Sequence, residues 1–181
     1  MIEAKDTTAN KGLRRGFVKA RQRHLFNLYR HYARTSSYPF FVDISGPPPR
    51  MSFAQFVEYC TEDGATLSVF MNGDKIGGFV LISDIQLPME LANLDFYFFG
   101  ASPALDSPEA HMLKTTLARI LNIHALTRLQ MLVLEMENSK IELLKWMGFE
   151  VEGLLREHFF FRGAHHNLVV LSRTEALRHE V

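Results

Sequence analysis

The side chain of this sequence best suited to moving a proton is Asp95, within the aromatic stretch ANLDFYFFG. Because side chains alternate between the two faces of a strand, Asp95, Tyr97 and Phe99 are predicted to share one face. Aromatic surroundings would raise the pKa of the carboxyl from about 3.9 toward neutrality and make it a general base. The alternative is a carboxylate on the solvent side of the sheet. Glu135 and Glu137, alternate residues of the next predicted strand, are the second choice of base, or simply an acidic surface.

The histidine and cysteine residues do not point to a metal site. Of the eight histidines, His158, His165 and His166 fall in the last two predicted strands. Adjacent residues of a strand point to opposite faces, so His165 and His166 would not face one ion, and we expect no metal. The single cysteine, Cys60, excludes an internal disulfide and a Cys-rich zinc site, and it suits a reducing compartment.

The first half of the chain predicts two helices followed by three strands. The spacing of apolar residues predicts a helix over residues 17–35, and Ser52 is placed to cap a second, shorter helix. A hairpin follows, because Asn72-Gly73 supplies the positive φ angles of a tight turn. Residues 92–100 complete a meander of three strands.

The second half alternates helices and strands. It predicts a helix that begins at Ser107, a strand over residues 128–137, a helix over 138–148 opened by Asn138 or Ser139, and a closing hairpin. A strand, helix, strand order makes two strands parallel, whereas a meander and a hairpin are antiparallel. We therefore predict an α/β (α+β) fold with a mixed, mostly antiparallel central sheet of about six to seven strands flanked by about four helices.

Length and composition indicate one compact domain. The 181 residues are 47% hydrophobic and 22% charged, as in a globular chain that needs no disulfide. We expect a single domain over residues 17–181, preceded by a flexible basic arm at residues 1–16. No apolar run reaches about 18 residues and no hydrophobic signal segment is visible, so we expect a cytoplasmic protein without a membrane partner.

The formal net charge is zero, but basic residues concentrate between residues 11 and 34, where no acidic residue occurs. Such a segment can bind a polyanion, because neutralised phosphates release their counterions. The alternative is the solvated face of a helix, which the lack of an aromatic stacking pattern favours.

The run ENSKIELLKWMGFEVEGLLREHFFFRG contains an Asn followed by a small hydroxyl, a helix, Gly-Phe, Glu-Gly, an Arg and a final Gly. With the order of helices and strands, it resembles the GNAT superfamily, the Gcn5-related N-acetyltransferases, most closely the branch of ribosomal-protein and antibiotic acetyltransferases. The matching residues are Asn138, Ser139, Gly148, Phe149, Glu152, Gly153, Arg156 and Gly163. The resemblance implies a GNAT-like fold and an enzyme that uses acetyl-CoA as co-substrate.

The resemblance also implies where acetyl-CoA would bind. It would lie between the strands that end near Gly100 and Asn138, beside Phe98 and Phe99, at the crevice where open α/β sheets take ligands. Asn138 would contact the pantetheine or diphosphate group. The alternative role of Asn138 is an ordinary helix cap.

The catalytic groups follow from the same resemblance. Asp95 would take a proton from the attacking amine, and backbone N–H groups of residues 97–99 would stabilise the oxyanion. Many family members carry a Tyr that protonates the leaving thiolate, but Leu144 stands at that position. Ser139, Tyr97 or water would then serve, since a thiolate of pKa near about 8.5 can leave without an acid.

The loop before the third helix departs from the family pattern. The family binds the diphosphate there with a Gly-rich loop and the helix N-terminus. This chain has GASPALDSPEAHM instead, where Asp106 and Glu109 oppose a diphosphate.

We therefore expect an N-acyltransferase that moves an acetyl group from acetyl-CoA to an amine by direct attack in a ternary complex. The acceptor is a small molecule or a protein. One alternative keeps the fold but uses another acyl carrier, contacted by the basic segment at residues 11–34. Another is a non-catalytic GNAT-like domain that binds a protein or a nucleic acid. The closing hairpin could also pair with a second copy in a homodimer.

Overall fold

The structure is a computed structural model that describes residues 15–34, 41–42, 50–62 and 64–174. The strands are β1 (Arg15–Lys19), β2 (Thr66–Asn72), β3 (Lys75–Gln86), β4 (Leu91–Phe98), β5 (Arg128–Leu134), β6 (Glu150–Phe161) and β7 (Ala164–Thr174). The helices are α1 (Gln22–Arg34), α2 (Phe53–Thr61), α3 (Pro108–His124) and α4 (Asn138–Trp146), with a 3-10 turn, η1 (Leu87–Met89).

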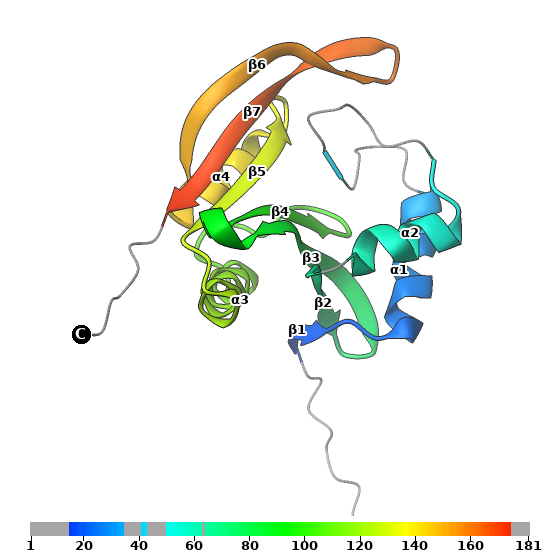
Figure 1. The fold of residues 1–181 in the computed structure, drawn as a ribbon. Helices are drawn as coiled ribbons and strands as arrows, with labels where there is room; N and C mark the ends of the chain where they lie inside the picture. The colour runs from blue at the N-terminus through cyan, green and yellow to red at the C-terminus, as the bar shows by residue number, and fades with distance from the viewer. Residues whose placement is uncertain (1–14, 35–40, 43–49, 63, 175–181) are drawn as a thin grey trace, which may run out of the picture.

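The strands form one seven-stranded sheet in the order β1-β2-β3-β4-β5-β7-β6. Of its described pairs, only β4 with β5 is parallel, which confirms the predicted mixed, mostly antiparallel α/β sheet. In Figure 1, α1 and α2 lie on one side of the molecule, and α3 and α4 on the other. No helix among the described residues is long and apolar enough to cross a membrane.

The N-terminal segment differs from the prediction of a helix over residues 17–35. Arg15–Lys19 form β1, which pairs with β2, and α1 begins only at Gln22. Arg15 and Gly16 therefore belong to the sheet and not to the expected arm, whose first fourteen residues lie outside the described ranges. A five-residue edge strand of mixed polarity has no clear period of its own, so its state depends on the strand that it pairs with.

Local signals correctly placed the N-caps of α2 and α3, the turn between β2 and β3, and the end of α4. The Ser52 hydroxyl accepts a hydrogen bond at the start of α2, and the Ser107 hydroxyl does the same for α3. Gly73, with φ of 63°, turns the hairpin between β2 and β3, and Gly148, with φ of 93°, ends α4. These positions depend on neighbours in the sequence, which explains why the sequence predicts them.

Each face of the sheet has its own hydrophobic core. Leu94 and Phe96 of β4 pack with residues of α3 and α4, whereas Tyr97 packs with residues of α1 and α2. The predicted alternation of β4 is thus confirmed. It assigns Asp95 to the same face as Tyr97, beneath α2.

Candidate active site

The parallel pair β4 and β5 opens toward its carboxyl ends. The two strands pair only through Leu91–Asn93 and Arg128–Gln130, at the beginning of each strand. Beyond these residues β4 runs on to Phe98 and β5 to Leu134 without pairing to each other. The carboxyl ends of parallel strands are the usual ligand site of such sheets.

Two predicted binding residues border this opening. Gly100, with φ of 122°, is exposed, and a Cβ added there would meet nothing within 4 Å. Asn138 is exposed at the start of α4, next to Ser139, which is also exposed. The N-cap position is held by Glu137, whose side chain makes no capping bond, so the prediction that Asn138 or Ser139 caps the helix is wrong.

The backbone of β4 narrows the set of predicted oxyanion donors. The Phe99 N–H donates to the Gly77 carbonyl of β3 at 2.8 Å, so this donor is already used within the sheet. Because successive N–H groups of a strand point to opposite edges, the Phe98 N–H points away from β3, toward the opening. Phe98 is therefore the donor that remains available there.

The side chains of Phe98 and Phe99 do not flank one binding position. Phe98 packs toward the core beneath α3, whereas the Phe99 ring stacks on His31 of α1, with centroids 3.9 Å apart. The two rings lie on opposite faces of β4, and their place beside acetyl-CoA stays a prediction.

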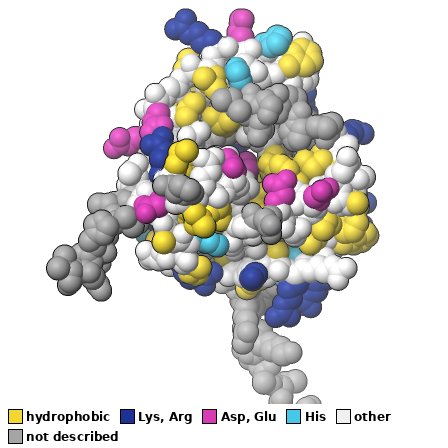
Figure 2. Space-filling model, in the orientation of Figure 1, with side chains coloured by type: hydrophobic (Ala, Val, Ile, Leu, Met, Phe, Trp, Pro, Cys, Tyr) yellow, Lys and Arg dark blue, Asp and Glu magenta, His cyan; other side chains and the backbone are white. Residues whose placement is uncertain are grey.

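Asp95 is 7% exposed and lines a cavity of about 300 Å³ beneath α2. The alternative prediction, that Asp95 lies on the solvent side of the sheet, is therefore wrong. Glu62 and Asp84 add two more carboxylates to the lining, and Tyr59 and Gln130 add polar groups. Figure 2 shows acidic side chains gathered near the middle of the face in view. Such a cavity favours a positively charged ligand.

The alternative base candidates lie elsewhere than predicted. Glu135 and Glu137 follow the end of β5 rather than forming part of it. Glu135 accepts a hydrogen bond from Asn167 at 2.7 Å. Glu137 lies 3.9 Å from the Lys140 ammonium, which sits over the Phe96 ring at 5.2 Å. Neither carboxylate lines the cavity of Asp95, which leaves Asp95 as the better candidate base.

The two candidate acids lie on different elements, Tyr97 on β4 and Ser139 on α4, which also carries Leu144, the residue that stands where many family members have a Tyr. Tyr97 is half-buried on the face that carries Asp95, with its ring 6.5 Å from that of Phe79. Ser139 is exposed at the start of α4. Leu144 is fully buried in the core that α3 and α4 form with the sheet.

The start of α3 is built for ion pairs within the protein. The Asp106 carboxylate lies 2.8 Å from Nε2 of His111, and Glu109 is paired with Arg15 of β1. Both carboxylates therefore sit where the family holds a diphosphate. This end of the opening does not fit that group.

Tyr59, Glu62 and Asp84 are site residues that the sequence did not reveal. They come from α2, the residue after it, and the end of β3, and they line the cavity of Asp95 through the packing of α2 on the sheet and the register of β3 with β4. No group of three or more His, Cys, Asp or Glu side chains among the described residues is arranged to hold a metal ion.

The sequence matches no protein-family model and no curated protein, but solved structures do match the fold. Spermidine N-acetyltransferase from Vibrio cholerae, in complex with CoA and spermine, has a TM-score of 0.72 at 15% identity, over 88% of this chain and 95% of that one. The fold is that of an N-acetyltransferase.

A second structure supports the same assignment. The V. cholerae spermidine/spermine N-acetyltransferase SpeG in complex with manganese ions has a TM-score of 0.68 at 16% identity, over 88% and 92% of the two chains. The GNAT fold predicted from the sequence is confirmed, while the ribosomal-protein branch stays a prediction.

Proposed function

We propose that this protein is an N-acetyltransferase that moves an acetyl group from acetyl-CoA to a small-molecule amine. The observation that carries the proposal is a buried carboxylate, Asp95, in an acidic cavity that is also lined by β5 residues, next to the opening between β4 and β5. The fold around it is shared with an acetyltransferase solved with CoA. A reducing cytoplasm that supplies acetyl-CoA suits this activity.

Binding of the amine follows from the charge of the cavity. Glu62, Asp84 and Asp95 attract an ammonium group into a space of about 300 Å³. Asp95 is the most buried of the three and lies on β4, the strand that borders the opening. It accepts a proton from the ammonium group and leaves a nitrogen lone pair free to attack.

The transfer of the acetyl group also needs a hydrogen-bond donor for the carbonyl oxygen and a proton for the leaving thiolate. The nitrogen attacks the thioester carbonyl carbon, the new C–N bond forms, and the C–S bond breaks. The Phe98 N–H donates to the carbonyl oxygen as negative charge develops on it. The nitrogen, positively charged once the C–N bond has formed, loses its second proton, and the thiolate takes up a proton through water, the Tyr97 hydroxyl or Ser139.

The same cavity supports a narrower acceptor class. Three carboxylates suit an amine with more than one positive charge, because one acts on the reacting nitrogen and the others hold the rest of the molecule. The V. cholerae neighbour was solved with spermine, a molecule of this kind. We therefore propose a polyamine-like acceptor.

The test is the release of free CoA from acetyl-CoA in the presence of spermidine, spermine or a neutral amine. Asp95→Asn is expected to lower kcat by about 100-fold or more, the usual contribution of a positioned base. Glu142→Gln, a carboxylate on the exposed surface of α4, is the matched control and should leave kcat unchanged. Equal turnover by Asp95→Asn and the parent protein would contradict the role of Asp95.

The acidic start of α3 favours one second candidate, a non-catalytic domain with the same fold. Isothermal titration calorimetry separates the two functions. The enzyme must bind acetyl-CoA, whereas no heat of binding at millimolar ligand would support the non-catalytic domain.

A further inference from the structure

Among the described residues, the start of α3 offers an acyl donor that carries phosphates neither a Gly-rich loop nor an unpaired cation. Near this helix end, Arg15 is paired with Glu109, and Nε2 of His111 lies 2.8 Å from the Asp106 carboxylate. The Lys114 ammonium lies over the Trp146 ring, 4.8 Å from its centroid. Positive charge for the phosphates must therefore come from other residues at this end of the sheet.

A second cavity, of about 380 Å³, lies between the end of α1 and the start of β3. We call it the basic groove, and define it by Arg30, His31 and Arg34 of α1, with Asp74 and Lys75 of the hairpin. Three permanent cations face one carboxylate there. No ion pair in the described part of the chain engages Arg30, Arg34 or Lys75.

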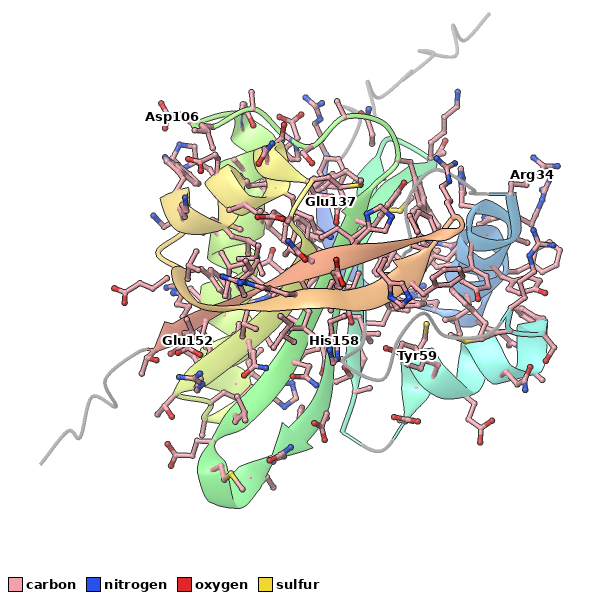
Figure 3. All side chains as sticks on the ribbon, turned by 90° about the horizontal axis from the view of Figure 1, so that it is seen from above. Arg34, Tyr59, Asp106, Glu137, Glu152 and His158 are labelled. Carbon is pink, nitrogen blue, oxygen red and sulfur yellow. The ribbon has the colours of Figure 1, made fainter. Side chains whose placement is uncertain are left out.

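The basic groove lies at the same end of the sheet as the opening, where β3 starts and β4 ends. β3 starts at Lys75 and pairs with the end of β4 through Gly78 and Phe98. His31, a residue of the groove, stacks on Phe99, one position before Gly100, with ring planes 11° apart. Figure 3 shows Asp106, Glu137 and Arg34 toward the same edge, with Asp106 and Arg34 on opposite sides of Glu137.

The electrostatics of His31 agree with a positive groove. Burial and the charges of Arg34 and Arg30 lower the pKa of this imidazole. A guanidinium binds a phosphate through two parallel hydrogen bonds, and an ammonium binds it as a point charge. Arg30, Arg34 and Lys75 thus offer the chemistry that the start of α3 lacks.

We propose that the basic groove binds phosphate groups of the acyl donor, in place of the Gly-rich loop that this chain lacks. This inference rests on the proposed acetyltransferase function. The carrier's thioester end enters between β4 and β5 at Gly100, and its phosphates turn toward α1 rather than toward α3. The proposal assigns a phosphate ligand to Arg30 and Arg34, two residues of the basic segment at residues 11–34.

The test compares two double variants of equal charge in the full chain. Arg34→Gln with Lys75→Gln removes two cations from the groove. Arg23→Gln with Arg119→Gln removes two exposed cations outside it. Calorimetry with acetyl-CoA, dephospho-CoA and adenosine 3′,5′-bisphosphate measures the dissociation constants, and thermal unfolding confirms that both variants fold.

The groove variant is expected to bind acetyl-CoA at least about tenfold more weakly, with a smaller salt dependence. The control variant should stay within about twofold of the parent, since its cations touch no phosphate. A smaller loss with dephospho-CoA would assign the groove to the 3′-phosphate. An equal loss would assign it to the diphosphate.

Failure of the groove and failure of the proposed function are distinguishable. If the parent protein binds acetyl-CoA and the groove variant binds it equally well, the groove assignment is overturned and the acetyltransferase stands. If the parent protein binds the bisphosphate but not acetyl-CoA, the assignment to an acyl donor is overturned together with the proposed function.

Discussion

Burial between α2 and the sheet affects Cys60, a residue of α2, and Asp95 of β4 in different ways. Cys60 is 2% exposed, and burial raises the pKa of its thiol to about 12, with a further contribution from the negative charge of Asp95. The thiol therefore stays protonated at neutral pH and is not a nucleophile. Asp95 lines the cavity and is the base that we propose.

This difference can be measured by thiol labelling. At a pH of about 8, Cys60 should react with Ellman's reagent at least about 100-fold more slowly in the native protein than in guanidinium chloride. Burial blocks access, and the raised pKa removes the thiolate. Stoichiometric labelling of the native protein within the time needed for the denatured one would show that the packing of α2 on the sheet does not shield this residue.

At the scale of elements, the contact between β3 and β4 sets the position of the candidate oxyanion donor. A Cβ added to Gly78 would lie 2.5 Å from the Tyr97 carbonyl oxygen. Only a residue without a side chain lets β3 come this close to the end of β4. The position of the Phe98 N–H thus depends on Gly78.

Gly78→Ala is expected to destabilise the protein by about 1–3 kcal/mol and to lower kcat, because β4 must shift away from β3. Urea unfolding and the CoA-release assay measure the two effects. Gly153→Ala in β6 is the control: a Cβ there meets nothing within 4 Å, so stability should change by less than about 0.5 kcal/mol. Similar losses from the two substitutions would rule out the steric explanation.

Elements also show how far sequence reasoning reaches. Gly73, Gly148 and Ser107 act on their own neighbours, so the turns and caps were predictable. The strand β1 was missed because it is defined by pairing with β2. Strand alternation allowed Asp95 to lie either among aromatic side chains or on the solvent side of the sheet, and it did not decide between them. Its carboxylate neighbours and the basic groove depend on contacts between distant segments, which no local pattern specifies.

At the scale of the whole molecule, the sheet consists of two parts, β1 to β4 and β5 with β7 and β6. Three parallel residue pairs join them, and Arg128 belongs to the first, opposite Leu91. The Arg128 guanidinium donates to Glu152 of β6, which also accepts a hydrogen bond from Ser172 of β7 at 2.5 Å. Glu152 therefore connects three strands at the closed end of the opening. Glu152, which matches the Glu of the Glu-Gly pair in the GNAT resemblance, thus has a structural role in this protein.

Stability should accordingly depend on the charge of Glu152. The hydrogen bond from Ser172, then that from Arg128, lowers the pKa of this carboxyl from its ordinary value of 4.5. A carboxyl with a lowered folded pKa stabilises the protein above its unfolded pKa, and this contribution is lost as pH falls through the folded pKa.

Glu152→Gln should therefore lower the free energy of unfolding at pH 7 by less than about 1 kcal/mol, because the ion pair is partly exposed. The difference from the parent protein should shrink only as pH falls below 4.5 and through the lowered pKa of the folded carboxyl, where the parent's carboxyl becomes protonated as well. Urea unfolding at several pH values measures it, with Glu150→Gln, an exposed neighbour in β6, as control. A difference that stays constant with pH would mean that packing, rather than the ionised carboxylate, holds the closed end of the opening.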